Sequence, residues 1–175
     1  MRNLLTATVV AAALALTACG GTDGPSTFAQ DGYPFTFEYP ADFTASDDVS
    51  FDSELGAKAD DTTAVGLDNS NGIVLQRYTL NIEVTADNLD RAQAEFDQLV
   101  SQIDPTASGS AGETAGFPSL SYDAVAVPAP PEGESRLTLL FDGDQEFVLN
   151  CQSTPDERDV IDAACDQALE TVAAS

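Results

Sequence analysis

The chain has 175 residues, of which 30 are Asp or Glu and 6 are Lys or Arg, so its formal net charge is −24. This charge opposes binding to nucleic acid and to anionic lipid headgroups, because both require Lys and Arg. Histidine is absent, which excludes Ser-His and Cys-His catalytic pairs and any His-ligated metal site. The length favours one domain. We expect a protein that is not an enzyme and that needs no cofactor or metal.

The N-terminal residues have the pattern of a bacterial lipoprotein signal. A cationic start is followed by the apolar run Leu4–Ala18, which is too short to cross a bilayer, since that takes about 20 residues. The run ends in Leu16-Thr17-Ala18-Cys19, where small residues precede a thiol that can accept a diacylglyceryl group. We predict a signal peptide over residues 1–18 and a lipid on Cys19, which would anchor the protein to the extracytoplasmic face of the cell membrane. An ordinary secretory signal is the alternative, because its cleavage site needs only small residues.

The composition changes after the predicted lipid site. Residues 19–31 are rich in glycine and polar residues and predict a flexible tether. A single domain is expected over residues 32–175. Its first strand is expected at Tyr33–Pro40, where aromatic residues alternate and a proline ends the run. These aromatic side chains could line an apolar ligand groove, but a place in the core is the better interpretation.

Further strands and a first helix follow in the chain. Short strand candidates lie at Val49–Ser53 and Ala64–Leu67, and the longest strand signal is Ile73–Val84. A helix is expected after Asp87, its predicted N-cap, and it should end before Pro105. Its apolar residues recur with helical spacing: Leu89, Ala92, Phe96, Leu99, Val100 and Ile103.

The C-terminal third predicts three strands and a second helix. Residues 105–118 have loop composition, and Ser119–Val127 predicts a strand. Two alternating runs, Ser135–Phe141 and Gln145–Cys151, are joined by Asp-Gly-Asp, which is a strong hairpin signal. A capping pattern at Thr154–Glu157 predicts the start of the last helix. Its apolar stripe consists of Val160, Ile161, Ala164, Cys165, Ala168, Leu169 and Val172. Strands joined by hairpins predict an α+β fold in which an antiparallel sheet is flanked by helices.

The two cysteines that remain besides Cys19 predict a disulfide. Cys151 lies on the apolar face of a predicted strand, and Cys165 lies on the apolar stripe of the helix expected to cover that face. A cysteine pair in an exported chain favours a bridge. It would close a loop of about 14 residues, worth roughly 3 kcal/mol in the chain-entropy estimate. A redox-active pair is less well supported, because C-x-x-C spacing is absent and apolar surroundings raise a thiol pKa.

Two groups of acidic residues are candidates for cation binding. Asp142, Asp144 and Glu146 could bind Ca²⁺ through oxygen atoms, but the spacing lacks the glycine and the final glutamate of an EF-hand loop. A solvated hairpin turn is the better interpretation. A second acidic stretch could form a weak cation site or a surface for a basic partner, but a mobile loop is the better interpretation. It contains Asp47, Asp48, Asp52, Glu54, Asp60 and Asp61.

The segment Phe35–Phe43, FTFEYPADF, resembles the first strand and turn of the PsbP-like α/β/α sandwich, with its pattern F-x-F-x-Y-P-x-x-F/W. The hairpin at Leu137–Cys151 and the last helix also fit, so the resemblance covers most of residues 33–174. It is strongest to the small exported lipoprotein members in actinobacteria. The family's named relatives are accessory proteins; one stabilises the photosynthetic oxygen-evolving centre and another binds a nuclear GTPase. No binding residue of either can be matched to this chain, so the resemblance implies non-catalytic binding without naming a partner.

These observations predict a membrane-anchored lipoprotein that acts as a non-catalytic binding or accessory protein of the cell envelope and engages an envelope protein. The alternative is a binder of a small apolar molecule or lipid, which would use a groove between the sheet and a helix. A hydrolase with paired carboxylates is a third hypothesis, but the sequence singles out no pair of acids for it.

Overall fold

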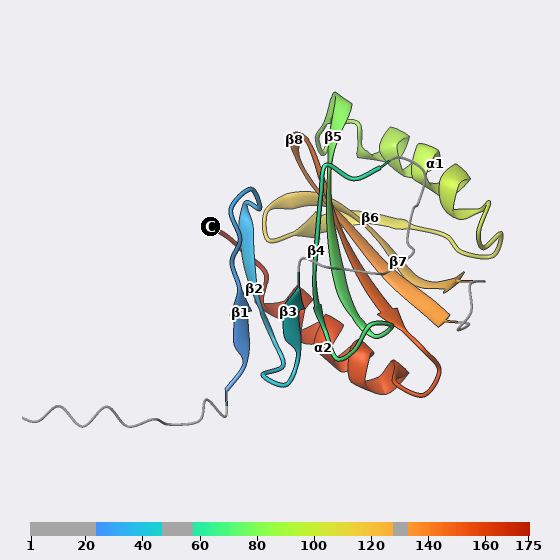
Figure 1. The fold of residues 1–175 in the computed structure, drawn as a ribbon. Helices are drawn as coiled ribbons and strands as arrows, with labels where there is room; N and C mark the ends of the chain where they lie inside the picture. Colours follow the sequence, from blue (N-terminus) through green and yellow to red (C-terminus); the bar gives the residue numbers. More distant parts are fainter. Residues whose placement is uncertain (1–23, 47–57, 128–132) are drawn as a thin grey trace, which may run out of the picture.

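The structure is a computed structural model that describes residues 24–46, 58–127 and 133–175. Within these ranges the chain forms two antiparallel sheets and two helices (Figure 1). The elements in chain order are β1 (Ser26–Phe28), β2 (Phe35–Tyr39), β3 (Thr44–Ser46), β4 (Asp61–Gly66), β5 (Gly72–Val84), α1 (Leu89–Val100), β6 (Ser110–Thr114), β7 (Phe117–Val127), β8 (Gly133–Ser153), α2 (Arg158–Thr171) and β9 (Ala173–Ala174).

The small sheet has the strand order β1-β2-β9, and the large sheet has the order β3-β4-β5-β8-β7-β6. Strand β8 doubles back at Gly143, which has a φ of +63°. Its first arm pairs with β7 and its second arm pairs with β5. The turn brings the two arms together, so Leu137 of the first arm and Val148 of the second arm line the same pocket. In a straight strand these two residues would lie roughly 36 Å apart. The predicted hairpin is therefore present, and it forms the centre of the large sheet.

The large sheet is covered on both faces, which confirms the predicted α+β fold with an antiparallel sheet between helices. Helix α2 and the small sheet lie on one side, and α1 lies on the other (Figure 1). Alternation along each strand assigns successive side chains to the two sides. Leu149 and Cys151 join the core under α2, whereas Val148 joins the core under α1.

Aromatic side chains fill the core between the large sheet, α2 and the small sheet. The rings of Phe28 and Phe37 stack with their centroids 4.8 Å apart. Phe35 packs edge-on against Phe147 at 5.6 Å. The backbone N–H of Glu38 donates to Thr171 Oγ1 over 2.8 Å, which ties β2 to α2. The alternating aromatics of the first predicted strand are thus core residues, as the sequence favoured.

The folded domain begins earlier than the sequence predicted. The tether was expected to extend to residue 31, but Ser26–Phe28 forms β1 and pairs with β2. The ring of Phe28 is only 6% exposed. Although this region is rich in glycine, it contains one large aromatic residue, Phe28. Burial of the Phe28 ring brings the segment into the small sheet.

Helix and strand boundaries also differ from the expectations. The N-cap of α1 is Asn88 instead of Asp87, and Asn88 Oδ1 accepts a hydrogen bond from the backbone N–H of Thr85 over 2.8 Å. Helix α1 ends at Val100, ahead of the expected stop, and α2 begins at Arg158 with Glu157 as its N-cap.

Thr154 has a different role from the predicted cap. Its backbone N–H and its hydroxyl both donate to Asn71 Oδ1, over 2.7 and 3.1 Å, which ties the segment before α2 to the β4–β5 loop.

The predicted loop at 105–118 contains β6, which pairs with β7 as an edge strand. The strand expected at Val49–Ser53 lies outside the described residues.

The structure joins Cys151 of β8 to Cys165 of α2 in a disulfide, with their Cα atoms 6.0 Å apart. Both residues belong to the core under α2. The bridge therefore ties the second arm of β8 to the helix that covers it.

Neither helix in the described part of the chain is long and apolar enough to cross a bilayer.

Candidate binding pocket between the sheet and helix α1

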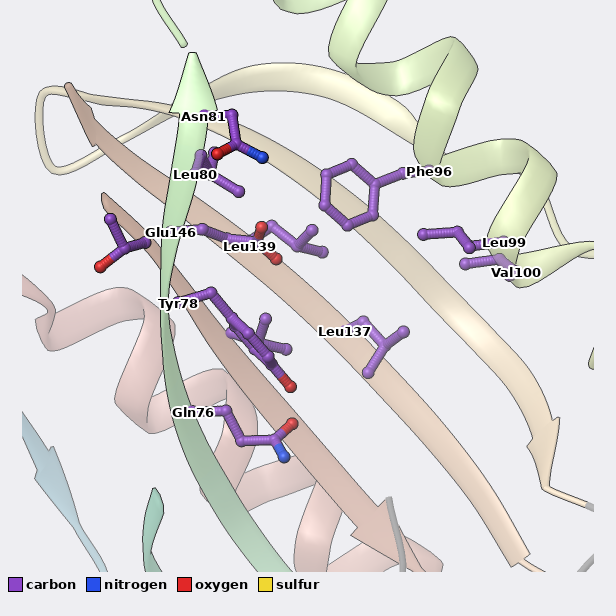
Figure 2. Close-up of a pocket in the computed structure, with 12 residues that line it drawn as sticks. Gln76, Tyr78, Leu80, Asn81, Phe96, Leu99, Val100, Leu137, Leu139 and Glu146 are labelled. Carbon is purple, nitrogen blue, oxygen red and sulfur yellow. The ribbon is translucent and has the colours of Figure 1, made fainter. Parts of the chain in front are cut away.

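A pocket of about 350 Å³ lies between α1 and the large sheet (Figure 2). We call it the α1 pocket. Its volume falls in the range of small-molecule sites, roughly 300 to 1,000 Å³. Its lining comes from β5, α1 and both arms of β8, namely Gln76, Tyr78, Thr79, Leu80, Asn81, Phe96, Leu99, Val100, Leu137, Leu139, Glu146 and Val148.

The position of α1 explains why a pocket remains on this face. Helix α1 packs against β6 and β7, at one side of the large sheet. On the opposite face, α2 packs against β2, β5 and β8, and the small sheet completes that layer. The strands beside α1, namely β5 and the second arm of β8, therefore form the floor of the pocket.

Hydrogen bonds hold α1 at this position. Gln93 Nε2 donates to the carbonyl oxygen of Gly109 over 2.7 Å, and the hydroxyl of Tyr122 donates to Asp97 Oδ1 over 2.9 Å. Burial and the neighbouring Asp97 raise the pKa of Tyr122, so the phenol stays protonated and remains a donor. Glycine is required at position 109, because a Cβ there would lie 2.5 Å from the Tyr122 ring.

One wall of the pocket is apolar and comes from two directions. Figure 2 shows Phe96, Leu99 and Val100 projecting from α1 toward Leu137 and Leu139 of the sheet. The ring of Phe96 lies 6.2 Å from that of Phe141, which fixes its orientation at the helix–sheet contact. Leu99 is 42% exposed and lies at the solvent side of this wall.

The floor of the pocket places three polar side chains among apolar ones, since β5 and the second arm of β8 also contribute Leu80 and Val148. The β5–β8 register pairs Tyr78 with Glu146 and Gln76 with Val148, so these side chains share one face of the sheet. Figure 2 shows Gln76, Tyr78 and Glu146 in a row beneath the apolar wall. Gln76 and Glu146 are 8% and 5% exposed, respectively. An apolar wall beside a floor that carries polar side chains is suited to an amphiphilic ligand.

Glu146 has the strongest electrostatic perturbation among the carboxylates of the described chain. Burial raises the pKa of Glu146 to about 7, because removal of water disfavours the charged form. The described residues that line the pocket include no lysine or arginine. Near neutral pH the pocket therefore contains a carboxyl group that is poised between its neutral and charged forms.

Comparison with known proteins assigns the fold. The chain is similar to cyanobacterial PsbP (CyanoP) from Synechocystis sp. PCC 6803, with a TM-score of 0.59 and 11% identity over 91% of this chain and 99% of that chain. The fold is PsbP-like. No protein-family model matches the sequence, and no curated protein sequence matches it.

Two further solved structures have lower scores. LpqN of Mycobacterium tuberculosis, which is involved in cell envelope biogenesis, has a TM-score of 0.48 at 13% identity over 85% of this chain and 90% of that chain. A protein of Bacteroides thetaiotaomicron has a TM-score of 0.48 at 10% identity over 85% of this chain and 48% of that chain. At these scores neither structure adds to the assignment of the PsbP-like fold.

The structure separates the three acids of the candidate Ca²⁺ site. Asp142 and Asp144 are exposed at the hairpin turn, whereas Glu146 is buried in the α1 pocket. In the described ranges, no group of three or more His, Cys, Asp or Glu side chains is placed to hold a metal ion. Four acids of the second stretch, at positions 47, 48, 52 and 54, lie outside those ranges, as does Cys19.

The groove that the sequence analysis considered is formed by other residues of the PsbP-like domain. The aromatics of Tyr33–Pro40 belong to the opposite core, whereas the pocket is lined by β5, by the predicted apolar stripe of α1 and by both arms of β8. Sequence reasoning missed Glu146 as a pocket residue. The sequence placed Glu146 with Asp142 and Asp144 in a solvated hairpin turn, and this was wrong because Glu146 is only 5% exposed. The one contrary signal is Val148, an apolar residue on the same face of the strand.

Proposed function

We propose that this protein is a non-catalytic binding protein of the cell envelope, anchored to the membrane by a lipid on Cys19, and that it holds a small amphiphilic molecule in the α1 pocket. The observation that carries the proposal is the pocket itself, which combines a mostly apolar lining with two buried polar side chains, Gln76 and Glu146. Such a combination of apolar lining with a few convergent polar groups is the usual form of a ligand site.

The chemistry of the pocket favours binding over catalysis. Glu146 is the one Asp or Glu among the described lining residues, whereas glycoside hydrolysis by carboxylates needs two. The PsbP-like fold supports the same conclusion only as an analogy, since folds do not define functions. The ligand is therefore expected to leave the protein unchanged.

The proposed location rests on the N-terminal sequence and on the disulfide. Bridges of this kind persist in oxidising compartments outside the cytoplasm, and the structure contains one between Cys151 and Cys165. A diacylglyceryl group supplies two acyl chains, which anchor a protein far more firmly than one.

Replacement of the predicted lipid site tests the anchor. In a Cys19→Ser variant the thiol acceptor is lost, so we expect the protein to leave the membrane fraction almost completely. Fractionation with immunodetection measures this change, and the intact mass of the membrane-extracted wild type should include a diacylglyceryl group. Thr17→Ser, a small-for-small change in the same signal, is the matched control. Retention of Cys19→Ser in the membrane at the wild-type level would refute lipid anchoring.

Binding in the α1 pocket can be tested with N-phenyl-1-naphthylamine, a neutral fluorophore whose emission increases in apolar surroundings. Leu99→Gln removes an apolar side chain from the wall while keeping good helix propensity. We expect the dissociation constant to rise about fivefold, which corresponds to roughly 1 kcal/mol of lost apolar contact. Fluorescence titration measures it.

The matched control for this experiment is Val160→Gln. Val160 is 43% exposed on α2, close to the 42% of Leu99, but it does not line the pocket. Its substitution should leave the titration unchanged. Equal affinities for wild type and Leu99→Gln would place the binding site elsewhere. A protein partner found by in-cell crosslinking, together with no probe binding, would instead favour the accessory protein that engages an envelope protein, which the sequence predicts first.

A further inference from the structure

We propose that the α1 pocket selects amphiphiles with a cationic amine headgroup, and that Glu146 is the residue that recognises the amine. This inference rests on the proposed function and names the chemical class of its ligand. Three features of the pocket support it: the place of the carboxyl group, the absence of a basic residue among the described lining, and the sign of the protein's charge.

The first feature is the position of the buried carboxyl group beside the apolar wall of the pocket. Glu146 is 5% exposed and pairs across strands with Tyr78. Leu139 and Phe96 lie on the apolar wall beside it (Figure 2). A ligand whose chain packs along this wall would bring its headgroup to the Glu146 carboxyl.

The second feature is that the described lining of the pocket supplies no basic side chain to pair with this carboxyl. A buried carboxylate is costly unless it is paired and hydrogen-bonded. Burial raises the pKa of Glu146 to about 7, and the described lining contains neither lysine nor arginine. The other ionisable group among the described lining residues is the Tyr78 phenol on β5. Helix α1 and the first arm of β8 contribute only uncharged lining residues, namely Phe96, Leu99, Val100, Leu137 and Leu139. An ammonium within hydrogen-bond distance would favour the carboxylate and complete the pair.

The third feature is the overall charge of −24. It attracts cations and repels anions at long range. At short range, the Glu146 carboxylate would repel a fatty acid carboxylate. A neutral alcohol could occupy the same space and accept or donate one hydrogen bond, but it would gain no charge pairing. The expected order of affinity is therefore amine, then alcohol, then carboxylate.

Three single-chain probes of the same length test this order: octylammonium, octanol and octanoate. Each is titrated against the wild type at pH 8 by displacement of N-phenyl-1-naphthylamine. We expect octylammonium to bind about tenfold more tightly than octanol, which is the effect of one favourable charge pair, and octanoate to bind most weakly. In Glu146→Gln, which keeps the shape of the side chain, octylammonium and octanol should bind equally.

A proton measurement gives an independent readout. At pH 6 the Glu146 carboxyl is mostly protonated, so pairing with an ammonium should release about one proton for each ligand bound. Calorimetry in two buffers with different ionisation enthalpies measures that proton, and Glu146→Gln should release none. Leu99→Gln is the matched variant on the apolar wall. It should weaken octylammonium and octanol alike and keep the preference for the amine.

The outcomes separate this inference from the function on which it rests. If octanol binds and octylammonium binds no more tightly, the pocket is a binding site but the amine inference is wrong. A preference for the amine that persists in Glu146→Gln also overturns it, since another group would then recognise the amine. If N-phenyl-1-naphthylamine binds and none of the three probes displaces it, the amine inference is wrong while the pocket remains a binding site. If the fluorophore itself does not bind, the proposed function fails and the amine inference fails with it.

Discussion

Replacement of Glu146 by glutamine is expected to stabilise the folded protein at pH 8 by on the order of 3 kcal/mol. Burial raises the pKa of this carboxyl from its ordinary 4.5 to about 7, and each pKa unit corresponds to about 1.4 kcal/mol. The folded state thus binds the proton more tightly than the unfolded state. The stabilising contribution of the protonated carboxyl is complete below pH 4.5, is lost as the pH rises to about 7, and stays lost above that value.

Glutamine has nearly the same shape and stays neutral at every pH, so the variant avoids this loss. Urea unfolding at pH 8 and at pH 4.5 measures the difference in free energy of unfolding from the wild type, and comparison at one pH cancels the titration of the other acids. At pH 4.5 the difference should fall below about 1 kcal/mol. Glu113→Gln, at an exposed position on the edge strand β6, is the matched control and should change stability little at either pH.

An equal effect of Glu146→Gln at both pH values would show that the buried carboxyl is not destabilised by its charge. The expected result also bears on function. A residue that lowers the stability of the fold near neutral pH and lines a pocket fits a ligand-binding role better than a structural one, because functional groups commonly cost stability.

Removal of the disulfide is expected to lower the free energy of unfolding by about 3 kcal/mol in a Cys151→Ala, Cys165→Ala double variant. The bridge joins residues 14 apart in sequence, and closing a loop of that length restricts the unfolded chain. It also ties α2 to β8 within the aromatic core. Thermal and urea unfolding measure the change, and addition of reductant should destabilise the wild type without affecting the double variant.

The surface ion pair between Arg136 and Asp166 provides the control, because it joins the same strand and helix without a covalent bond. Arg136→Gln should cost less than about 1 kcal/mol, as exposed pairs usually do. Two free thiols in the intact mass of the exported protein, or no loss of stability in the double variant, would show that the bridge does not support the fold.

These two predictions concern opposite faces of the same sheet. On one face, α2, the small sheet and the disulfide enclose a core rich in aromatic residues. On the other face, α1 covers the side formed by β6 and β7, and the α1 pocket lies beside it. The aromatic core and the disulfide on the first face do not include Glu146, so the cost of burying this carboxyl falls on the other face.

The sequence by itself was sufficient for the features that depend on local patterns. The alternation in β5 and in both arms of β8, the Asp-Gly turn between the arms and the apolar stripes of both helices all predicted elements that the structure contains. The pairing of Cys151 with Cys165 followed from the same patterns, because each cysteine lies on the apolar side of its element. The absence of histidine limited the chemistry without reference to any fold.

Long-range packing decided the remaining features. Phe28 stands in a glycine-rich segment, and its burial against Phe37 brings the segment into the domain. Strand β6 has few apolar residues and exists through its pairing with β7. For Glu146, alternation assigns the side chain to the same face as Val148 and cannot say what covers that face. The helix α1, held by contacts from Gly109 and Tyr122, makes this face the floor of a pocket, and only the tertiary structure determines that placement.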